Sequence, residues 1–234
     1  MIDQTIDARV IGIFVGFVAI IIIFLYLIYK IFRYYRTRLN ITFSGCYIFI
    51  VISLTINIIY ILLKIPQLVI ILNSITNYTV CFSTIFVTVF LISLYRGYER
   101  FSLRKQLSII LIYGLLLAVM FFIPGGVIIN EETNWTPIWS WTLFIYVASV
   151  IIIISVIPTL FYSFKLYKKF EDNQIKRKWK YFIIGSIQLY LNLLGTLFIN
   201  TLNIPFIRLG WYIFLIFNSI SAAYLTYYGL AGKV

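Results

Sequence analysis

Ala19-Ile-Ile-Ile-Ile-Phe24 is the stretch that decides the fold class, because it lies within an apolar run over residues 10–32 that carries no charge before Lys30. About 20 apolar residues in a helix are long enough to cross the hydrocarbon core of a bilayer. A continuous apolar stretch also lacks the alternation of a barrel strand. Since backbone groups in lipid must be hydrogen-bonded within their own segment, the run predicts a transmembrane helix.

Six further apolar runs follow the first along the 234-residue chain. The seven predicted helices cover about 10–32, 41–63, 79–97, 107–129, 139–163, 181–203 and 207–229. The chain is 62% hydrophobic and 11% charged, and a soluble domain could not cover so much apolar surface. We therefore expect an all-α membrane protein, a seven-transmembrane-helix bundle that forms a single domain over 1–234 and lies in the cell (plasma) membrane.

Lysine and arginine are divided unequally between the gaps. Sixteen of the 19 basic residues follow the first, third and fifth runs or lie in the C-terminal tail. They are Lys30, Arg33, Arg36, Arg38, Arg96, Arg100, Arg104, Lys105, Lys165, Lys168, Lys169, Lys176, Arg177, Lys178, Lys180 and Lys233. The other side keeps Arg9, Lys64 and Arg208. Because basic residues beside membrane spans mark the cytoplasmic side, the N-terminus is predicted outside and the C-terminus inside. The net charge of +12 thus reflects topology, and we expect no nucleic-acid partner.

The longest polar gap, 164–180, is predicted to extend the two neighbouring helices beyond the membrane. Anionic headgroups attract juxtamembrane Lys and Arg at roughly 1 kcal/mol each, so anionic lipids are one expected partner of this inner face. A cytosolic signalling partner is the alternative. The residues that would form either contact are Lys165, Lys168, Lys169, Lys176, Arg177 and Lys178.

The spans lack the residues that most membrane chemistry requires. No Asp, Glu, Lys or Arg lies near the middle of a span, whereas pumps, ion-coupled carriers and voltage sensors use such groups. The chain has no His, and its two cysteines, Cys46 and Cys81, are predicted near opposite ends of their helices, too far apart for a disulfide or a shared metal. We therefore expect a non-enzymatic protein with no metal and no cofactor.

Uncharged polar side chains remain within the spans. Gln188, Asn192 and Thr196 follow at four-residue spacing and form one stripe of their helix. With the helices alternating in direction, six candidates fall between the middle and the outer half of the membrane: Asn57, Thr84, Thr88, Asn192, Thr196 and Asn218. They predict an outward-facing pocket for a small ligand. The alternative is hydrogen bonding between helices, worth about 0.6 kcal/mol each.

Small residues and prolines predict three local features. Gly12-Ile-Phe-Val-Gly16 is a GxxxG pattern, which permits close approach of a helix from the same chain or of a second protomer in a homo-oligomer. Pro158 predicts a kink or a loosened hydrogen-bond ladder in the fifth helix. Pro124-Gly125-Gly126 predicts the end of the fourth helix.

Four short patterns are shared with a known family: Ile157-Pro-Thr-Leu-Phe-Tyr162, the basic turn Ile175-Lys-Arg-Lys178, the glycines Gly185 and Gly195, and Tyr227-Tyr-Gly-Leu230. With them the chain resembles the seven-transmembrane sensor modules of microbial histidine kinases and their stand-alone archaeal seven-helix relatives. The resemblance implies signal reception in the membrane. The sequence ends at Val234 without a kinase, so its output would need a separate partner.

A sensor or receptor-like module that signals to a cytosolic partner is therefore the expected function. Two alternatives stay open. One is a small-solute transporter of the 3+1+3 type, since Pro66-Gln67 resembles the dipeptide of PQ-loop transporters and seven helices suit that group and the related sugar transporters. The other is a structural or assembly subunit whose helices bind other membrane proteins.

Overall fold

The computed structural model describes the backbone of residues 2–34, 37–97 and 100–231, and the side chains of 14–34, 37–97 and 100–230. Expectations for the side chains of Arg9, Arg36 and Lys233, and for the surroundings of Gly12, lie outside those described residues. Within the described chain, seven helical segments are long and apolar enough to cross a membrane, as predicted. The chain is a polytopic integral membrane protein.

Four of the spans precede the longest loop and three follow it. The first four are α1 (Ile2–Tyr34), α2 (Arg38–Ile61), α3 (Pro66–Arg96) and α4 (Leu103–Ala118), which continues into the 3₁₀ turn η1 (Val119–Phe122). The fifth is continuous through α5 (Trp141–Ile151), the π-helical turn η2 (Ile152–Val156) and α6 (Ile157–Lys169). The last two are α7 (Asn173–Leu202) and α8 (Pro205–Ala231).

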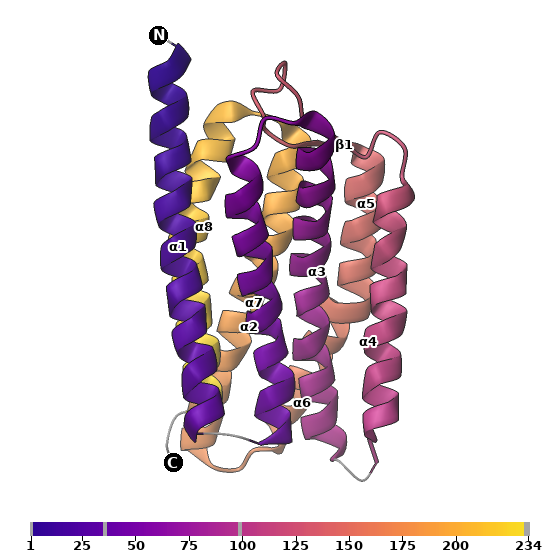
Figure 1. Cartoon of the computed structure of the whole chain (residues 1–234). Helices are drawn as coiled ribbons and strands as arrows, with labels where there is room; N and C mark the ends of the chain where they lie inside the picture. Colours follow the sequence, from indigo (N-terminus) through magenta and orange to yellow (C-terminus); the bar gives the residue numbers. More distant parts are fainter. Residues whose placement is uncertain (1, 35–36, 98–99, 232–234) are drawn as a thin grey trace.

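The spans form one antiparallel bundle with the chain termini at opposite ends (Figure 1). We call the end where α1 begins the N-terminal end and the opposite one the C-terminal end. Helix α1 contacts α2 and α8, while α3 contacts α2, α4, α6 and α7. An odd number of spans places the two termini apart in this way. Which end faces the cell exterior stays a prediction from the charge distribution.

The third helix begins at Pro66, much earlier than the predicted residue 79. Proline suits the first turn of a helix, where its missing N–H is not needed. The polar residues Asn73, Thr76 and Asn77 gave this segment the composition of a loop, yet all three are buried inside the bundle. The predicted outer loop therefore shrinks to residues 62–65.

The fourth helix ends at Ala118 rather than near residue 129, because the chain turns at Pro124-Gly125-Gly126, as that pattern predicted. Gly125 has a φ of 63°, a left-handed conformation that glycine adopts without strain. Beyond it, β1 (Val127–Ile128) pairs antiparallel with β2 (Ile138–Trp139). The expected short loop 130–138 is thus the tip of a longer hairpin-like connection.

The fifth and sixth spans extend beyond the apolar runs, as expected. Helix α6 continues to Lys169 and α7 begins at Asn173, where the Asp172 carboxylate accepts a hydrogen bond from the Gln174 N–H at 2.6 Å. Pro158 lacks an N–H, and the backbone before it forms the π-helical turn, in which the Ile157 N–H reaches the Ile152 carbonyl. The predicted loosening of this hydrogen-bond ladder is confirmed.

A layer of aromatic side chains fills the C-terminal half of the bundle. The Phe43 ring centroid lies 5.0 Å from that of Tyr47, 5.4 Å from Phe90 and 5.9 Å from Phe182. Phe24 of α1 meets Tyr47 at 4.9 Å. We call these five residues the aromatic layer. All are buried, and the layer joins α1, α2, α3 and α7.

Glycines bring the last two helices into close contact. A Cβ atom on Gly185 would lie 2.7 Å from the Thr226 nitrogen and 2.9 Å from the Ala222 oxygen, both backbone atoms of α8. Gly16 lies against the side chain of Ile216 on α8. Half of the GxxxG pattern therefore serves packing within the chain, and a homo-oligomer through Gly12 and Gly16 stays a prediction.

Candidate ligand cavity

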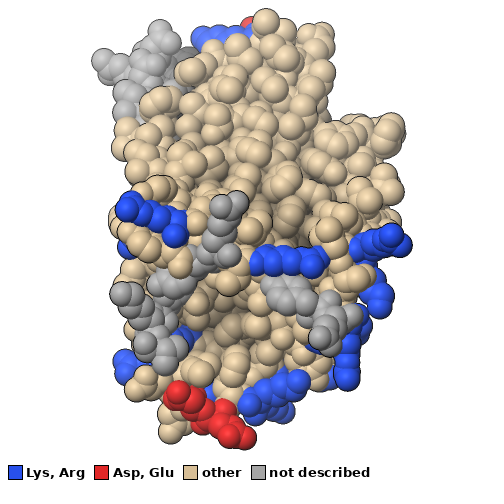
Figure 2. Space-filling model, turned by 60° about the horizontal axis from the view of Figure 1, so that its bottom comes forward, with Lys and Arg blue, Asp and Glu red and all other residues tan. Residues whose placement is uncertain are grey.

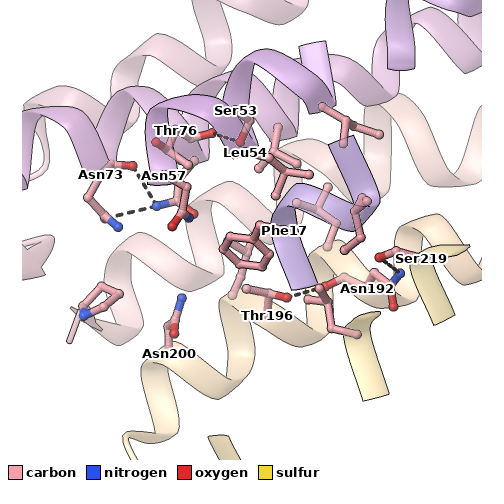
Figure 3. A pocket seen from close by; sticks show the side chains of 18 of the residues that line it. Phe17, Ser53, Leu54, Asn57, Asn73, Thr76, Asn192, Thr196, Asn200 and Ser219 are labelled. Atoms are coloured by element: carbon pink, nitrogen blue, oxygen red, sulfur yellow. Dashed lines mark hydrogen bonds between the residues drawn. The ribbon is translucent and has the colours of Figure 1, made fainter. Parts of the chain in front are cut away.

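A cavity of about 520 Å³ opens into the N-terminal half of the bundle between α1, α2, α3, α7 and α8 (Figure 3). This volume lies within the range of roughly 300–1,000 Å³ found for small-molecule sites. Three exposed loop residues, Lys64, Glu131 and Asn134, line its upper end. The cavity therefore reaches the surface at the N-terminal end.

The wall formed by α2 and α3 holds its amides in fixed positions. The Asn73 side-chain nitrogen donates to the Tyr60 hydroxyl at 3.0 Å, and the Asn77 nitrogen donates to the Asn73 side-chain oxygen at 3.1 Å. The Ser53 hydroxyl donates to the Thr76 carbonyl at 2.9 Å and ties the two helices together. Asn73 and Asn77 are four residues apart, so both lie on one face of α3.

The wall formed by α7 and α8 is organised around Asn192. Its side-chain nitrogen donates to the Ser219 hydroxyl at 2.9 Å, and its side-chain oxygen accepts from Asn218 at 2.7 Å. The Thr196 hydroxyl donates to the Asn192 carbonyl at 2.6 Å and accepts from the Trp211 ring nitrogen at 3.0 Å. Asn218 therefore hydrogen-bonds to Asn192 from behind and does not itself line the cavity.

Two amides face the cavity from opposite walls, Asn57 on α2 and Asn200 on α7 (Figure 3). Within the described part of the chain, neither makes a side-chain hydrogen bond, although Asn200 is only 5% exposed. The buried Thr76 hydroxyl has no partner there either. Buried polar groups are normally hydrogen-bonded, so these groups are available to water or to a bound molecule.

The inner end of the cavity, its floor, meets the aromatic layer. Phe24, Cys46 and Val87 line the cavity, and Phe24 also belongs to the aromatic layer. Cys46 and Cys81 are both buried free thiols. The cavity thus opens toward the N-terminal end of the bundle, and the buried aromatic layer lies on its other side.

Tyr190 connects this floor to the π-helical turn. Its hydroxyl lies 2.8 Å from the Ser155 hydroxyl and 2.9 Å from that of Thr159. Thr88 lies 3.0 Å from Ser155 and 2.9 Å from Thr159, and Ser155 also donates to the Thr84 carbonyl at 3.1 Å. These five residues, the hydroxyl cluster, are all buried and link α3, η2, α6 and α7.

Four of the six predicted pocket residues line one cavity: Asn57, Thr84, Asn192 and Thr196. The other two do not line the cavity. Thr88 lies behind the cavity lining in the hydroxyl cluster, and Asn218 lies behind Asn192. Sequence reasoning missed Asn73 and Asn77, because it placed them in a loop. It also missed Asn200, although this residue continues the four-residue stripe from Asn192 and Thr196.

The lining is uncharged below its upper end. Among the described residues, the ionisable side chains of the cavity other than tyrosines and Cys46 are Lys64 and Glu131, and both lie at its mouth. Among the described residues, no group of His, Cys, Asp and Glu could hold a metal ion. A charged ligand at the floor would lose its hydration without a counter-charge, so the cavity suits an uncharged polar molecule.

No family model, no curated protein and no solved structure matches the chain. Besides the cavity, the second candidate surface is the basic rim of the C-terminal end, where Lys and Arg gather (Figure 2). Helix α6 places Lys165, Lys168 and Lys169 there, and α7 places Lys176, Arg177 and Lys178.

Proposed function

We propose that the chain is a receptor-like sensor module that binds a small uncharged polar solute in the cavity. The observation that carries this proposal is the pair of facing amides, Asn57 and Asn200, which lack partners within the described chain. An amide both donates and accepts hydrogen bonds, and it complements hydroxyl and carboxamide groups better than an ion. With the N-terminal end outside, the solute would arrive from the exterior.

The route from ligand to output runs through Tyr190. This residue lines the cavity, and its hydroxyl bonds to Ser155 and Thr159 of the span that ends at Lys169. A π-helical turn is an irregular point in a helix and frequently lies at functional sites. A ligand that moved Tyr190 would change the conformation of this turn. Through α6, that change would reach the basic rim, where a cytosolic partner would bind.

A transporter remains the second candidate, because a cavity open at one end and closed by an aromatic layer also fits one state of an alternating-access carrier. The two functions differ in what happens to the solute. A receptor keeps it on one side of the membrane, whereas a transporter releases it on the other.

The test begins with purified protein in lipid nanodiscs and a panel of uncharged sugars, polyols and amides, each paired with a charged analogue. We expect uncharged members to raise the thermal unfolding temperature of the wild type and their charged analogues to leave it unchanged. Asn57→Leu or Asn200→Leu should weaken the binding by about threefold to tenfold, since each hydrogen bond is worth roughly 0.5–1.5 kcal/mol. Gln67→Leu, an exposed amide outside the cavity, is the matched control.

Three outcomes would contradict the receptor proposal. Stabilisation by no uncharged member of the panel would exclude a solute-binding cavity of this kind. Accumulation of the stabilising solute in proteoliposomes would favour the transporter. Stable association with another membrane protein, independent of any solute, would favour the assembly subunit.

A further inference from the structure

Two lysines on α6 share one aromatic ring at the C-terminal end of α3. The Lys169 ammonium lies 4.1 Å from the centroid of the Tyr95 ring, and the Lys165 ammonium lies 5.6 Å from it. Lys165 also lies 4.3 Å from the Phe161 ring. Cations at these distances are attracted to the face of a ring, so both side chains are held at one point of the surface rather than spread over it.

An arginine adds a third cation to the same group. The Arg96 guanidinium donates to the Tyr162 hydroxyl at 3.4 Å, and the Tyr162 ring centroid lies 5.4 Å from that of Tyr95. Arg96, Lys165 and Lys169 are exposed. In the part of the chain that the structure describes, none of the three forms an ion pair with Asp or Glu.

Three like charges gathered so closely repel one another, and a bound anion would relieve that repulsion. The rings orient the cations but do not neutralise them. Helices α3 and α6 end here, at the level where tyrosines mark the membrane interface and where lipid phosphates lie. On the neighbouring surface of α6, Phe161 and Phe164 are each 51% exposed, and they offer contacts to acyl chains.

We propose that Tyr95, Arg96, Phe161, Tyr162, Lys165 and Lys169 form a discrete site for one anionic phospholipid, the Tyr95 site. The cations bind the phosphate of the headgroup, and the exposed phenylalanines contact the acyl chains. The site is more specific than the general attraction of a basic rim for anionic lipid. It depends on the membrane-spanning fold and is independent of the solute cavity.

Lys168 and Lys176 provide a matched comparison. They lie at the same end of the bundle, and Lys168 is in the same helical turn as Lys165 and Lys169. Within the described residues, neither ammonium lies over an aromatic ring. The double variant K168Q/K176Q therefore removes the same charge as K165Q/K169Q without touching the Tyr95 site.

The experiment measures lipid retention by native mass spectrometry of the full chain in non-ionic detergent, with palmitoyl-oleoyl phosphatidylglycerol or the corresponding phosphatidylcholine. We expect the wild type to retain one phosphatidylglycerol at concentrations where phosphatidylcholine is lost. K165Q/K169Q should weaken this binding on the order of 30-fold, because each of these ammonium groups would contact the phosphate directly. K168Q/K176Q should weaken it by less than about threefold, because exposed charges that do not contact the phosphate are screened by solvent and salt. Tyr95→Leu, which keeps every charge, should weaken it to an intermediate degree. Elution volume and circular dichroism check that each variant is folded.

Equal losses in the two double variants would overturn the proposal, because the rim would then act only through its total charge. Equal retention of the two lipids by the wild type would overturn it as well. If millimolar inorganic phosphate alone raised the unfolding temperature of the wild type but not of K165Q/K169Q, the site would belong to a free anion rather than to a lipid. None of these results bears on solute binding in the cavity.

Discussion

Tyr190 is the residue at which the cavity and the hydroxyl cluster meet. Its ring lines the cavity floor, while its hydroxyl bonds to Ser155 and Thr159 on the neighbouring span. Each hydroxyl there donates one hydrogen bond and accepts others, so the group is satisfied as a network. Loss of one hydroxyl leaves its neighbours with fewer hydrogen-bond partners in a buried setting, which costs more than the loss of an exposed hydroxyl.

Tyr190→Phe should therefore lower the free energy of unfolding by about 1 kcal/mol, within the range measured for hydrogen bonds between membrane helices. Thermal unfolding in detergent, followed by circular dichroism, measures the change. Tyr224→Phe removes a hydroxyl from a residue that is 60% exposed and should have almost no effect. Equal effects of the two substitutions would argue against a cooperative cluster.

The candidate site could be predicted in part from single residues. Asn57, Thr84, Asn192 and Thr196 were found because polar side chains inside apolar runs need partners or water. Asn200 could have been found by continuing the stripe of α7 for one more turn. Thr88 and Asn218 could not be separated from the lining, because sequence shows the depth of a residue but not the direction of its side chain within the bundle.

At the scale of elements, the contact between α7 and α8 depends on backbone proximity. Gly185 lies where an added methyl group would meet backbone atoms of Thr226 and Ala222. Backbone atoms cannot turn aside as a side chain can, so the helices would have to separate. Gly185 thus has a packing role in this chain.

Gly185→Ala should lower the free energy of unfolding by about 1–3 kcal/mol, the usual cost of overpacking. Gly210→Ala, on the same pair of helices, meets open space and should be neutral or stabilising by up to about 1 kcal/mol, because alanine favours the helix. Unfolding in mixed detergent, monitored by tryptophan fluorescence, compares the two. A neutral Gly185→Ala would contradict the close contact.

The ends of the elements were the least predictable part of the fold. The start of α3 was misplaced because Asn73, Thr76 and Asn77 look like a loop to any hydropathy argument, although a polar cavity lets them lie inside a membrane bundle. The end of α4 was recognisable from Pro124 and Gly125, but the apolar residues beyond it suggested further helix. Some of those apolar residues lie in the strands β1 and β2, which form because they pair with each other. Hydropathy carries no information on which segments pair.

At the scale of the whole molecule, the length of the apolar runs predicted seven spans. The structure has seven such helical segments among its described residues. The predicted orientation in the membrane rests only on the Lys and Arg residues of the basic rim. Lys168 on α6 and Glu131 at the cavity mouth lie at opposite ends of the bundle. These two positions therefore report which end faces the exterior.

Glu131→Cys should react with a membrane-impermeant maleimide in intact cells, and Lys168→Cys should react only after the membrane is opened. The native thiols need no replacement, because Cys46 is 2% exposed and Cys81 is 0% exposed. Mass spectrometry of the labelled protein gives the result. Reaction of Lys168→Cys from outside would reverse the orientation, and with it the side from which a solute enters.

The buried aromatic layer also has an electrical consequence. Water in a cavity conducts ions and polarises readily, whereas packed rings do neither. In an energised membrane the voltage therefore falls mainly across the layer of Phe43, Phe90 and Phe182, and the cavity stays near the potential of the compartment to which it opens. A solute that binds above the layer crosses almost none of the field, and an uncharged solute does no work against it, so its affinity would be the same in polarised and depolarised cells.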